Sequence, residues 1–259
     1  MNERLRSWRW RILVLCITAA LAYPALAQEK SLSPGINKGY DKPNVERIVK
    51  QYERENRDVV QHSKEIVAAC GLKPGMDVAD IGAGTGLHTR PIARKVAPDG
   101  KVYAVEITQP FLEQIEKTCR EQGIENVVCV HSKVGSTELG PKSIDVAFLC
   151  DTYHHFEYPY KMLDSIYAAL RPGGRLIIVD YKKEKGVSPD WVFGHVRADK
   201  STVIKECEKA GFTFLDEVPD AMKIHYIIRL QKPLTSASAS RETAACTKPT
   251  SQTVSPGSE

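Results

Sequence analysis

The strongest constraint on the fold of this chain is an alternation of short apolar runs with amphipathic stretches through its middle. The apolar runs have the length of buried strands, and most of the stretches between them have the length and spacing of a helix. Parallel strands that are covered on both faces are apolar throughout and need helical connections. The pattern therefore predicts an α/β domain: a doubly wound, mostly parallel seven-stranded sheet with helices on both faces.

The positions of the expected elements follow from these runs. The strands are Asp77–Ile81, Lys101–Glu106, Val127–His131, Ile144–Asp151, Arg175–Asp180, Thr213–Val218 and Ile224–Leu230. The helices are Val45–Cys70, Thr89–Val96, Gln109–Gln122, Pro159–Leu170 and Lys200–Ala210. No helix separates the last two strands, so we expect them to form an antiparallel hairpin at the edge of the sheet.

A glycine-rich loop connects the first expected strand to the next helix. It reads Asp80-Ile81-Gly82-Ala83-Gly84-Thr85-Gly86. Glycines in such a loop permit positive φ and let backbone amides approach a ligand at a helix N-terminus. The dinucleotide-binding fingerprint needs its third glycine one position later, where Leu87 stands, so the spacing disfavours NAD and FAD.

An acidic residue followed by x-G-x-G-x-G resembles the first motif of the class I S-adenosylmethionine-dependent methyltransferases. The resemblance runs from about Tyr40 to Lys232, and it implies a Rossmann-like fold and S-adenosylmethionine as the cofactor. The cofactor-binding residues that it implies are Asp80, Gly82, Ala83, Gly84, Thr85, Gly86, Glu106, Ile107, Ser132 and Asp151. Glu106 ends the second strand, where the family has an acidic residue for the ribose hydroxyls, and a carboxylate accepts well from two vicinal hydroxyls.

One position departs from the family pattern. At the end of the third strand the family commonly has an acidic residue that accepts from the adenine amino group, but this chain has Ser132 and then Lys133. A lysine is a donor only and cannot replace that acceptor. We expect Ser132 or a backbone group to take its place.

A polar cluster follows the fourth expected strand, with the sequence Asp151-Thr152-Tyr153-His154-His155-Phe156. It resembles the fourth methyltransferase motif, and its His-His-Phe continuation resembles the small-molecule branch that includes ubiquinone/menaquinone-biosynthesis enzymes. Asp151 is the first catalytic candidate, to orient or deprotonate a nucleophile, and His154 or His155 is the second. We expect one of the two histidines only to pack a helix start.

The adjacent histidines do not predict a metal site. Neighbouring histidines on one segment rarely point at one ion, and no cysteine or carboxylate spacing in the sequence completes a set of ligands. We therefore expect no metal.

Two further segments resemble the substrate side of this branch. A lid helix is expected over about residues 44–70, and an insertion follows the fifth strand. The substrate-binding candidates are Tyr40, Tyr153, His195 and Arg197. Substrate selection in a shared fold usually lies in such loops, because the scaffold itself is common to many activities.

The two ends of the chain differ from its middle. Residues 1–27 contain four arginines, an apolar run from Ile12 to Leu21 that is shorter than the roughly 20 residues of a spanning helix, and a small-x-small exit. This predicts a cleaved secretory signal peptide, with an uncleaved membrane anchor as the alternative. Residues 235–259, rich in Ser, Thr, Ala and Pro, predict a disordered tail. Residues 28–234 then form one methyltransferase domain of a periplasmic or secreted protein without an integral span.

Removal of the leader also changes the charge of the chain. The full net charge is +4, and residues 1–27 hold four Arg and one Glu, so the remainder carries +1. A nearly neutral domain gives no support for nucleic-acid binding. Six cysteines remain without a C-x-x-C pair, which favours buried free thiols over disulfides.

Together these features predict methyl transfer to a small-molecule acceptor by direct displacement at the sulfonium, where the protein mainly aligns the reactants. The sequence does not distinguish among four classes of acceptor: quinone-like compounds, lipid amines, arsenicals and proteins. The alternative is an exported, non-catalytic or degenerate protein that only binds the cofactor, since S-adenosylmethionine is made in the cytoplasm. The sequence does not indicate an oligomeric state.

Overall fold

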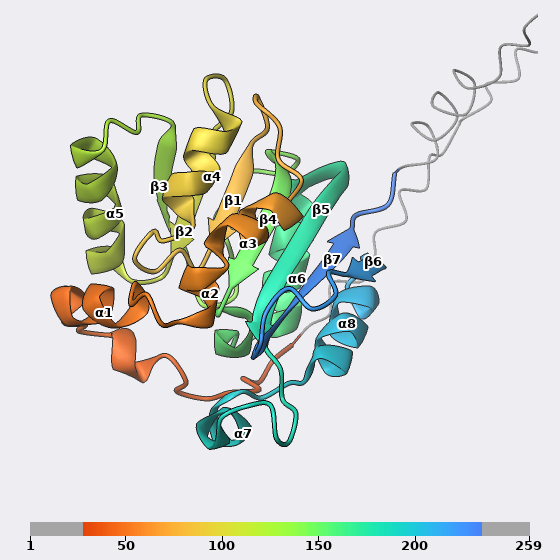
Figure 1. Cartoon of the computed structure of the whole chain (residues 1–259). Helices are drawn as coiled ribbons and strands as arrows, with labels where there is room; N and C mark the ends of the chain where they lie inside the picture. The colour runs from red at the N-terminus through yellow and green to blue at the C-terminus, as the bar shows by residue number, and fades with distance from the viewer. Residues whose placement is uncertain (1–27, 235–259) are drawn as a thin grey trace, which may run out of the picture.

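The computed structural model describes residues 28–234 and contains one seven-stranded sheet (Figure 1). The strands are β1 (Val78–Ile81), β2 (Val102–Glu106), β3 (Val127–His131), β4 (Ile144–Cys150), β5 (Leu170–Tyr181), β6 (Thr213–Glu217) and β7 (His225–Gln231). Their order across the sheet is β3-β2-β1-β4-β5-β7-β6. The first five strands pair in parallel, and β7 is antiparallel to both β5 and β6. The expected Rossmann-like architecture is confirmed, and the final hairpin joins the sheet through β7.

The fifth strand starts earlier than expected. It begins at Leu170, which pairs with Ile144, and the register then shifts so that Arg175 pairs with Val146. Residues 171–174, Arg-Pro-Gly-Gly, occupy this irregular stretch. The Pro and Gly residues therefore lie inside the strand at a bulge and do not precede it.

Helices precede β1 and occupy most of the connections between the strands. They are α1 (Val45–Tyr52), α2 (Asp58–Gln61), α3 (Ser63–Ala69), α4 (Thr89–Val96), α5 (Gln109–Glu121), α6 (Pro159–Ala169), α7 (Asp190–His195) and α8 (Lys200–Lys209), with short 3₁₀ turns η1 (Lys38–Tyr40) and η2 (Tyr153–His155). The turns and α7 were not expected from the sequence, because each is too short to show a helical period.

The prediction of one lid helix over residues 44–70 is wrong, since this segment forms α1, α2 and α3. Asn44 caps α1 by accepting from the backbone N–H of Arg47. The helix ends at Tyr52, whose carbonyl accepts from Arg57 Nη1 at 2.8 Å. No proline or glycine marks this stop, and the last carbonyls of the helix find a side-chain partner instead.

Alternate strand residues pack into two apolar cores. Ala147 and Leu149 of β4 belong to a core with α6 and α8, whereas Val146 and Phe148 belong to a core with α3 and α4. Since successive side chains of a strand point to opposite faces, these are the two faces of the sheet. The sheet is therefore buried on both sides, and ligands can reach it only at its edges.

The edge at the carboxyl ends of the parallel strands carries the candidate site. β1 lies between β2 and β4, so the chain order reverses direction at β1, which is the topological switch point where such sheets bind ligands. Figure 1 shows α1 and α7 on the side to which the arrows of β4 and β5 point. Within residues 28–234, no helix combines the length and the apolar character that crossing a membrane requires. The expected signal peptide and tail lie outside the described residues.

Candidate active site

The glycine-rich loop between β1 and α4 borders a cavity of about 630 Å³. Gly82 and Gly84 have φ values of +72° and +52°, which disfavour residues with a Cβ. A Cβ on Gly82 would lie 2.3 Å from Cγ2 of Thr152, whereas a Cβ on Gly84 would meet only the Gly82 carbonyl oxygen at 3.9 Å. Gly82 thus lets the loop pack against the end of β4, and Gly84 leaves its face open to a ligand.

Two buried carboxylates support the loop. Glu106, at the end of β2, accepts from the backbone N–H groups of Gly84 and Thr108, both at 3.0 Å. Asp80 accepts the Thr89 hydroxyl at 2.6 Å. Burial raises the pKa of Glu106, and it raises the pKa of Asp80 to about 7. Both carboxylates border the cavity, so their remaining acceptor positions can face a ligand.

The remaining cofactor candidates divide into residues that line the cavity and one glycine that supports them. Ala83, Thr85, Ile107, Ser132 and Asp151 line the cavity together with Asp80, Gly82, Gly84 and Glu106. Gly86 does not line it; a Cβ there would lie 3.0 Å from Cγ1 of Ile115 on α5. Gly86 therefore allows close packing of the loop against the next helix.

Lys133, which departs from the family pattern, points away from the cavity. Its side chain is 74% exposed and its Nζ lies 2.9 Å from Glu138 Oε2. The neighbouring Ser132 is buried and donates its backbone N–H to the Glu106 carbonyl at 2.9 Å. The lysine therefore does not place a positive charge in the adenine region of the expected site.

Asp151 is held between two cations. Its Oδ2 lies 2.5 Å from Arg57 Nη2, and its Oδ1 lies 3.0 Å from His225 Nε2. Burial raises the pKa of Asp151, but the charges of His225 and Arg57 outweigh it and lower the pKa to about 2. An aspartate that stays ionised is a poor proton acceptor, so the geometry favours orientation or electrostatic attraction over removal of a proton.

His225 connects Asp151 to a second carboxylate. Its Nδ1 lies 3.0 Å from Asp58 Oδ2, and Asp58 also accepts the backbone N–H of Ile224 at 2.9 Å. Burial lowers the pKa of His225, but Asp151 and Asp58 outweigh it and raise the pKa to about 9. The chain Asp58–His225–Asp151–Arg57 is therefore an alternating row of charges that fixes Asp151.

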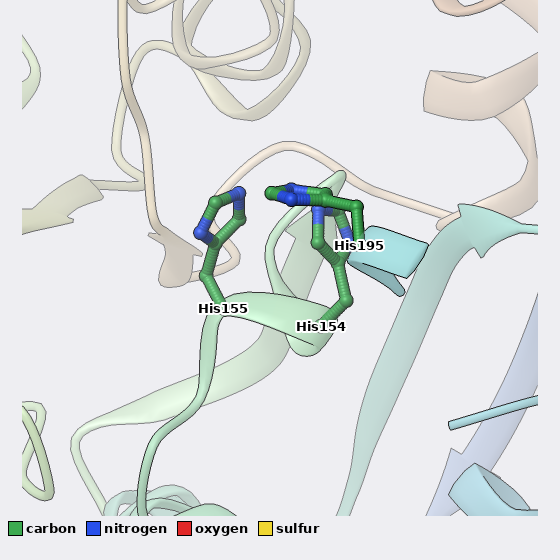
Figure 2. Close-up of side chains that lie close together, drawn as sticks. All are labelled: His154, His155 and His195. Carbon is green, nitrogen blue, oxygen red and sulfur yellow. The ribbon is translucent and has the colours of Figure 1, made fainter. Parts of the chain in front are cut away.

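The structure brings both predicted histidines and His195 together (Figure 2). His154 is buried, and its Nδ1 lies 2.7 Å from Asp180 Oδ1. Burial and, to a smaller extent, the neighbouring imidazoles of His154 and His195 together lower the pKa of His155 to about 3. His154, His155 and His195 could together hold one metal ion, since one ligand atom from each lies within 4.8 Å of the others. The argument against a metal site considered only the adjacent pair, and it fails because the fold supplies a third imidazole.

Tyr40 lies beside these histidines. Its ring lies 5.5 Å from that of His155, and its hydroxyl lies 2.5 Å from the Tyr52 hydroxyl. Burial raises the pKa of Tyr40, and the Tyr52 hydrogen bond adds to this effect. Tyr40 and His195 therefore both line the cavity.

Two predicted substrate-binding residues, Tyr153 and Arg197, bind a buried carboxylate of the protein itself. The Tyr153 hydroxyl donates to Glu206 Oε2 at 2.8 Å, and Arg197 forms two hydrogen bonds with Glu206, at 2.8 and 2.7 Å. Neither residue lines the cavity. Tyr153 instead joins η2 to α8, and Arg197 joins the segment before α8 to the same helix, because the Glu206 carboxylate is buried and needs these donors.

Two site residues, Asp180 and His225, were missed by sequence reasoning, and for Arg57 the sequence left open a contact with cofactor or substrate or a solvated helix charge. Asp180 offered a signal, since it is a carboxylate at the end of an apolar strand. Arg57 lies in a charged stretch, and His225 lies 167 residues from its partner Asp58. No local pattern distinguishes such residues from solvated ones.

The five cysteines in the described part of the chain, Cys70, Cys119, Cys129, Cys150 and Cys207, are free. Burial raises the pKa of the Cys150 thiol, which borders the cavity. A neutral, buried thiol is a weak nucleophile.

Comparison with known proteins identifies the family to which the core of the chain is similar. Residues 79–178 match the family described as "Methyltransferase domain". The chain is 27% identical over 169 residues to the arsenite methyltransferase of Halobacterium salinarum, covering 62% of this chain and 43% of that protein. It is 28% identical over 163 residues to the demethylmenaquinone methyltransferase of Symbiobacterium thermophilum, covering 60% of this chain and 59% of that protein.

A solved structure agrees with these matches. The structure of a SAM-dependent methyltransferase from Aquifex aeolicus superimposes with a TM-score of 0.65 and 24% identity, covering 74% of this chain and all of that one. The chain spans about half the length of the curated relatives it matches. The matches support a class I methyltransferase domain and S-adenosylmethionine as its cofactor, as predicted from the glycine loop.

Proposed function

We propose that this chain is an S-adenosylmethionine-dependent methyltransferase with a small-molecule acceptor. The observation that carries the proposal is the open face of Gly84 in a cavity at the topological switch point, next to the carboxylate of Glu106. A Cβ at this glycine would enter the space that the cofactor needs. The family match covers the same loop and the strands around it.

Bound S-adenosylmethionine supplies a methyl group on a positively charged sulfur, and transfer leaves the neutral thioether S-adenosylhomocysteine. The chain has to hold this cofactor and align the acceptor. Glu106 offers carboxylate oxygens for the ribose hydroxyls, and the glycine loop offers backbone N–H groups. Asp151 is ionised, and its ion pairs with Arg57 and His225 hold it in place in the cavity wall, where it can orient the acceptor.

The acceptor side of the cavity is the part lined by Tyr40, His155, Trp191 and His195. These side chains are aromatic and come from segments outside the sheet, so they can select a substrate without changing the scaffold. The names of both relatives contain a small molecule, arsenite in one and demethylmenaquinone in the other. This supports a small-molecule acceptor but does not indicate its chemical class.

The location and domain limits belong to the same proposal. The arginines, apolar run and small-x-small exit of residues 1–27 support export by a cleaved signal peptide. The methyltransferase domain then comprises residues 28–234, followed by a tail over residues 235–259. A fusion of residues 1–27 to a reporter that is active only outside the cytoplasm tests this part, and an inactive reporter would contradict it.

Calorimetry with S-adenosylhomocysteine tests the cofactor. We expect one site per folded chain, and we expect NAD to give no heat because of the glycine spacing. No heat at high micromolar S-adenosylhomocysteine from a folded chain would overturn the proposal. Labelled products from cell-envelope extracts with methyl-labelled cofactor then test transfer; binding without any product would favour the non-catalytic alternative.

A further inference from the structure

Three imidazoles from two distant segments meet in the wall of the cavity. His154 and His155 lie in η2, and His195 ends α7. Their ring centroids are 4.4 to 5.3 Å apart. Figure 2 shows one ring nitrogen of His155 directed toward the ring of His195, with the ring of His154 beside them.

The spacing is close to what a metal ion needs. One ligand nitrogen from each ring lies within 4.8 Å of the other two. A zinc-type ion binds imidazole at about 2.0–2.1 Å, which sets tetrahedral ligand nitrogens about 3.3 Å apart. The rings therefore need to approach by about 1.5 Å at most. His195 is partly exposed at the end of a six-residue helix, so its ring can move without disturbing the sheet.

Asp180 orients the His154 ring and fixes its tautomer for metal binding. Its Oδ1 lies 2.7 Å from His154 Nδ1, and its carboxylate also accepts the backbone N–H groups of His154 and Tyr181. A carboxylate is an acceptor, so Nδ1 carries the proton and Nε2 is left for an ion. This carboxylate–imidazole pair is the usual arrangement behind a metal-bound histidine.

Packing alone does not account for the cluster. The Nδ1 of His155 is buried and has no hydrogen-bond partner in the described part of the chain. An unpaired buried polar atom costs free energy, and apolar side chains would fill the same corner without that cost. The ring nitrogen of His155 that faces His195 is the other one, Nε2 (Figure 2), so an ion bound by the three rings compensates for the burial of the cluster but does not pair with Nδ1.

We propose that His154, His155 and His195 bind one divalent transition-metal ion of the zinc type. Imidazole ligands suit Zn²⁺, Ni²⁺ and Cu²⁺, whereas Mg²⁺ and Ca²⁺ prefer oxygen ligands. Three protein ligands leave a fourth position for a water molecule or a substrate atom. All three histidines line the cavity, so this position opens toward the acceptor. The metal site stands on its own; only its role beside an acceptor rests on the proposed function.

Metal titration of the purified, chelator-treated full chain tests the site. We expect one Zn²⁺ per chain by calorimetry, no heat from Mg²⁺, and visible absorption bands of a low-symmetry site with Co²⁺. His155→Ala and His195→Ala should each weaken Zn²⁺ binding by at least tenfold, and the double variant should abolish it. Asp180→Asn, which keeps an acceptor oxygen, should weaken binding about tenfold to 100-fold. His62→Ala, a half-exposed histidine outside the cluster, is the matched control and should bind like the unaltered chain.

The same samples separate this inference from the proposed function. S-adenosylhomocysteine binding to His195→Ala reports both the fold and the cofactor end of the cavity. If the unaltered chain binds S-adenosylhomocysteine but not Zn²⁺, or if His155→Ala and His195→Ala bind Zn²⁺ unchanged, the metal site is wrong. If the chain binds Zn²⁺ through these histidines but not S-adenosylhomocysteine, the metal site stands and the proposed function fails.

Discussion

The glycine end of the cavity, formed by residues 80–86 and Glu106, is built differently from its histidine end, formed by His154, His155 and His195 with Asp180. At the glycine end the contacts join nearby parts of the chain: Asp80 and Thr89 are 9 residues apart, and Gly84 and Glu106 are 22 apart. The donors there are mostly backbone N–H groups. At the histidine end, side chains from η2, β5 and α7 make the contacts.

This difference between the two ends indicates which part of the site can change among proteins that share the fold. The backbone loop depends on glycine φ values and on the βα topology, which a whole class of proteins shares. The histidine end is completed by His195, which lies in an insertion between β5 and α8 that can change without altering the sheet. We therefore expect the glycine end to fix the cofactor and the histidine end to fix the acceptor.

The largest expected effect is that of Gly82→Ala. The added Cβ would lie 2.3 Å from Thr152, at a φ of +72°, so the backbone conformation and the packing both become unfavourable. Left-handed backbone costs about 1–2 kcal/mol and overpacking about 1–3 kcal/mol, which together lower the free energy of unfolding by roughly 2–5 kcal/mol. Urea unfolding measures this. Gly75→Ala, at φ +85° with nothing within 4 Å, is the control and should lose only the backbone part.

The alternating row of charges Asp58–His225–Asp151–Arg57 predicts a pH dependence of the free energy of unfolding. The pKa of His225 is about 9 in the folded protein and about 6.5 when unfolded, so its contribution is full below pH 6.5 and is lost as the pH rises through 9. The free energy of unfolding should fall by up to about 3 kcal/mol across this window. In His225→Gln that slope should disappear. An equal slope in both proteins would show that His225 is not held between the two carboxylates.

Gly84→Ala separates the fold from ligand binding at the glycine end. Its Cβ would enter open cavity space, so the fold should persist with a loss of about 1–2 kcal/mol from the φ of +52°. S-adenosylhomocysteine affinity should fall at least tenfold by calorimetry, while Zn²⁺ affinity should stay unchanged. Gly123→Ala, at φ +63° in open space away from the cavity, carries the same backbone strain and should keep full affinity. Equal affinities in the two variants would remove Gly84 from the site.

The smallest expected effect is that of Lys133→Ala. The side chain is exposed and, within residues 28–234, its ion pair is with Glu138, so S-adenosylhomocysteine affinity should change less than about twofold, as for other exposed ion pairs. A larger change by calorimetry would show that the lysine reaches the cofactor. Because the side chain at this position points away from the cavity, Lys133→Asp should not raise the affinity either.

The sequence predicted the sheet well and the acceptor side poorly. Apolar runs fixed all seven strands, because burial on both faces requires apolar residues throughout. The break between α1 and α2 could not be predicted, because the signal that ends α1 is a hydrogen bond from Arg57 and not a helix-breaking residue. Tyr153 and Arg197 seemed suited to a substrate, but the buried Glu206 binds both.

What the sequence determined by itself is the class of fold and the glycine loop with its acidic neighbour, since these follow from periodicity and from contacts within about one βα unit. The tertiary structure alone decided which polar side chains share the cavity. Arg57 and Asp151 are 94 residues apart, and His195 reaches the His154–His155 pair only after β5, its insertion and α7 have folded back over the strand ends. Contacts between residues so far apart in the sequence leave no local sequence pattern, because the packing and the charges of the folded chain determine which side chains meet.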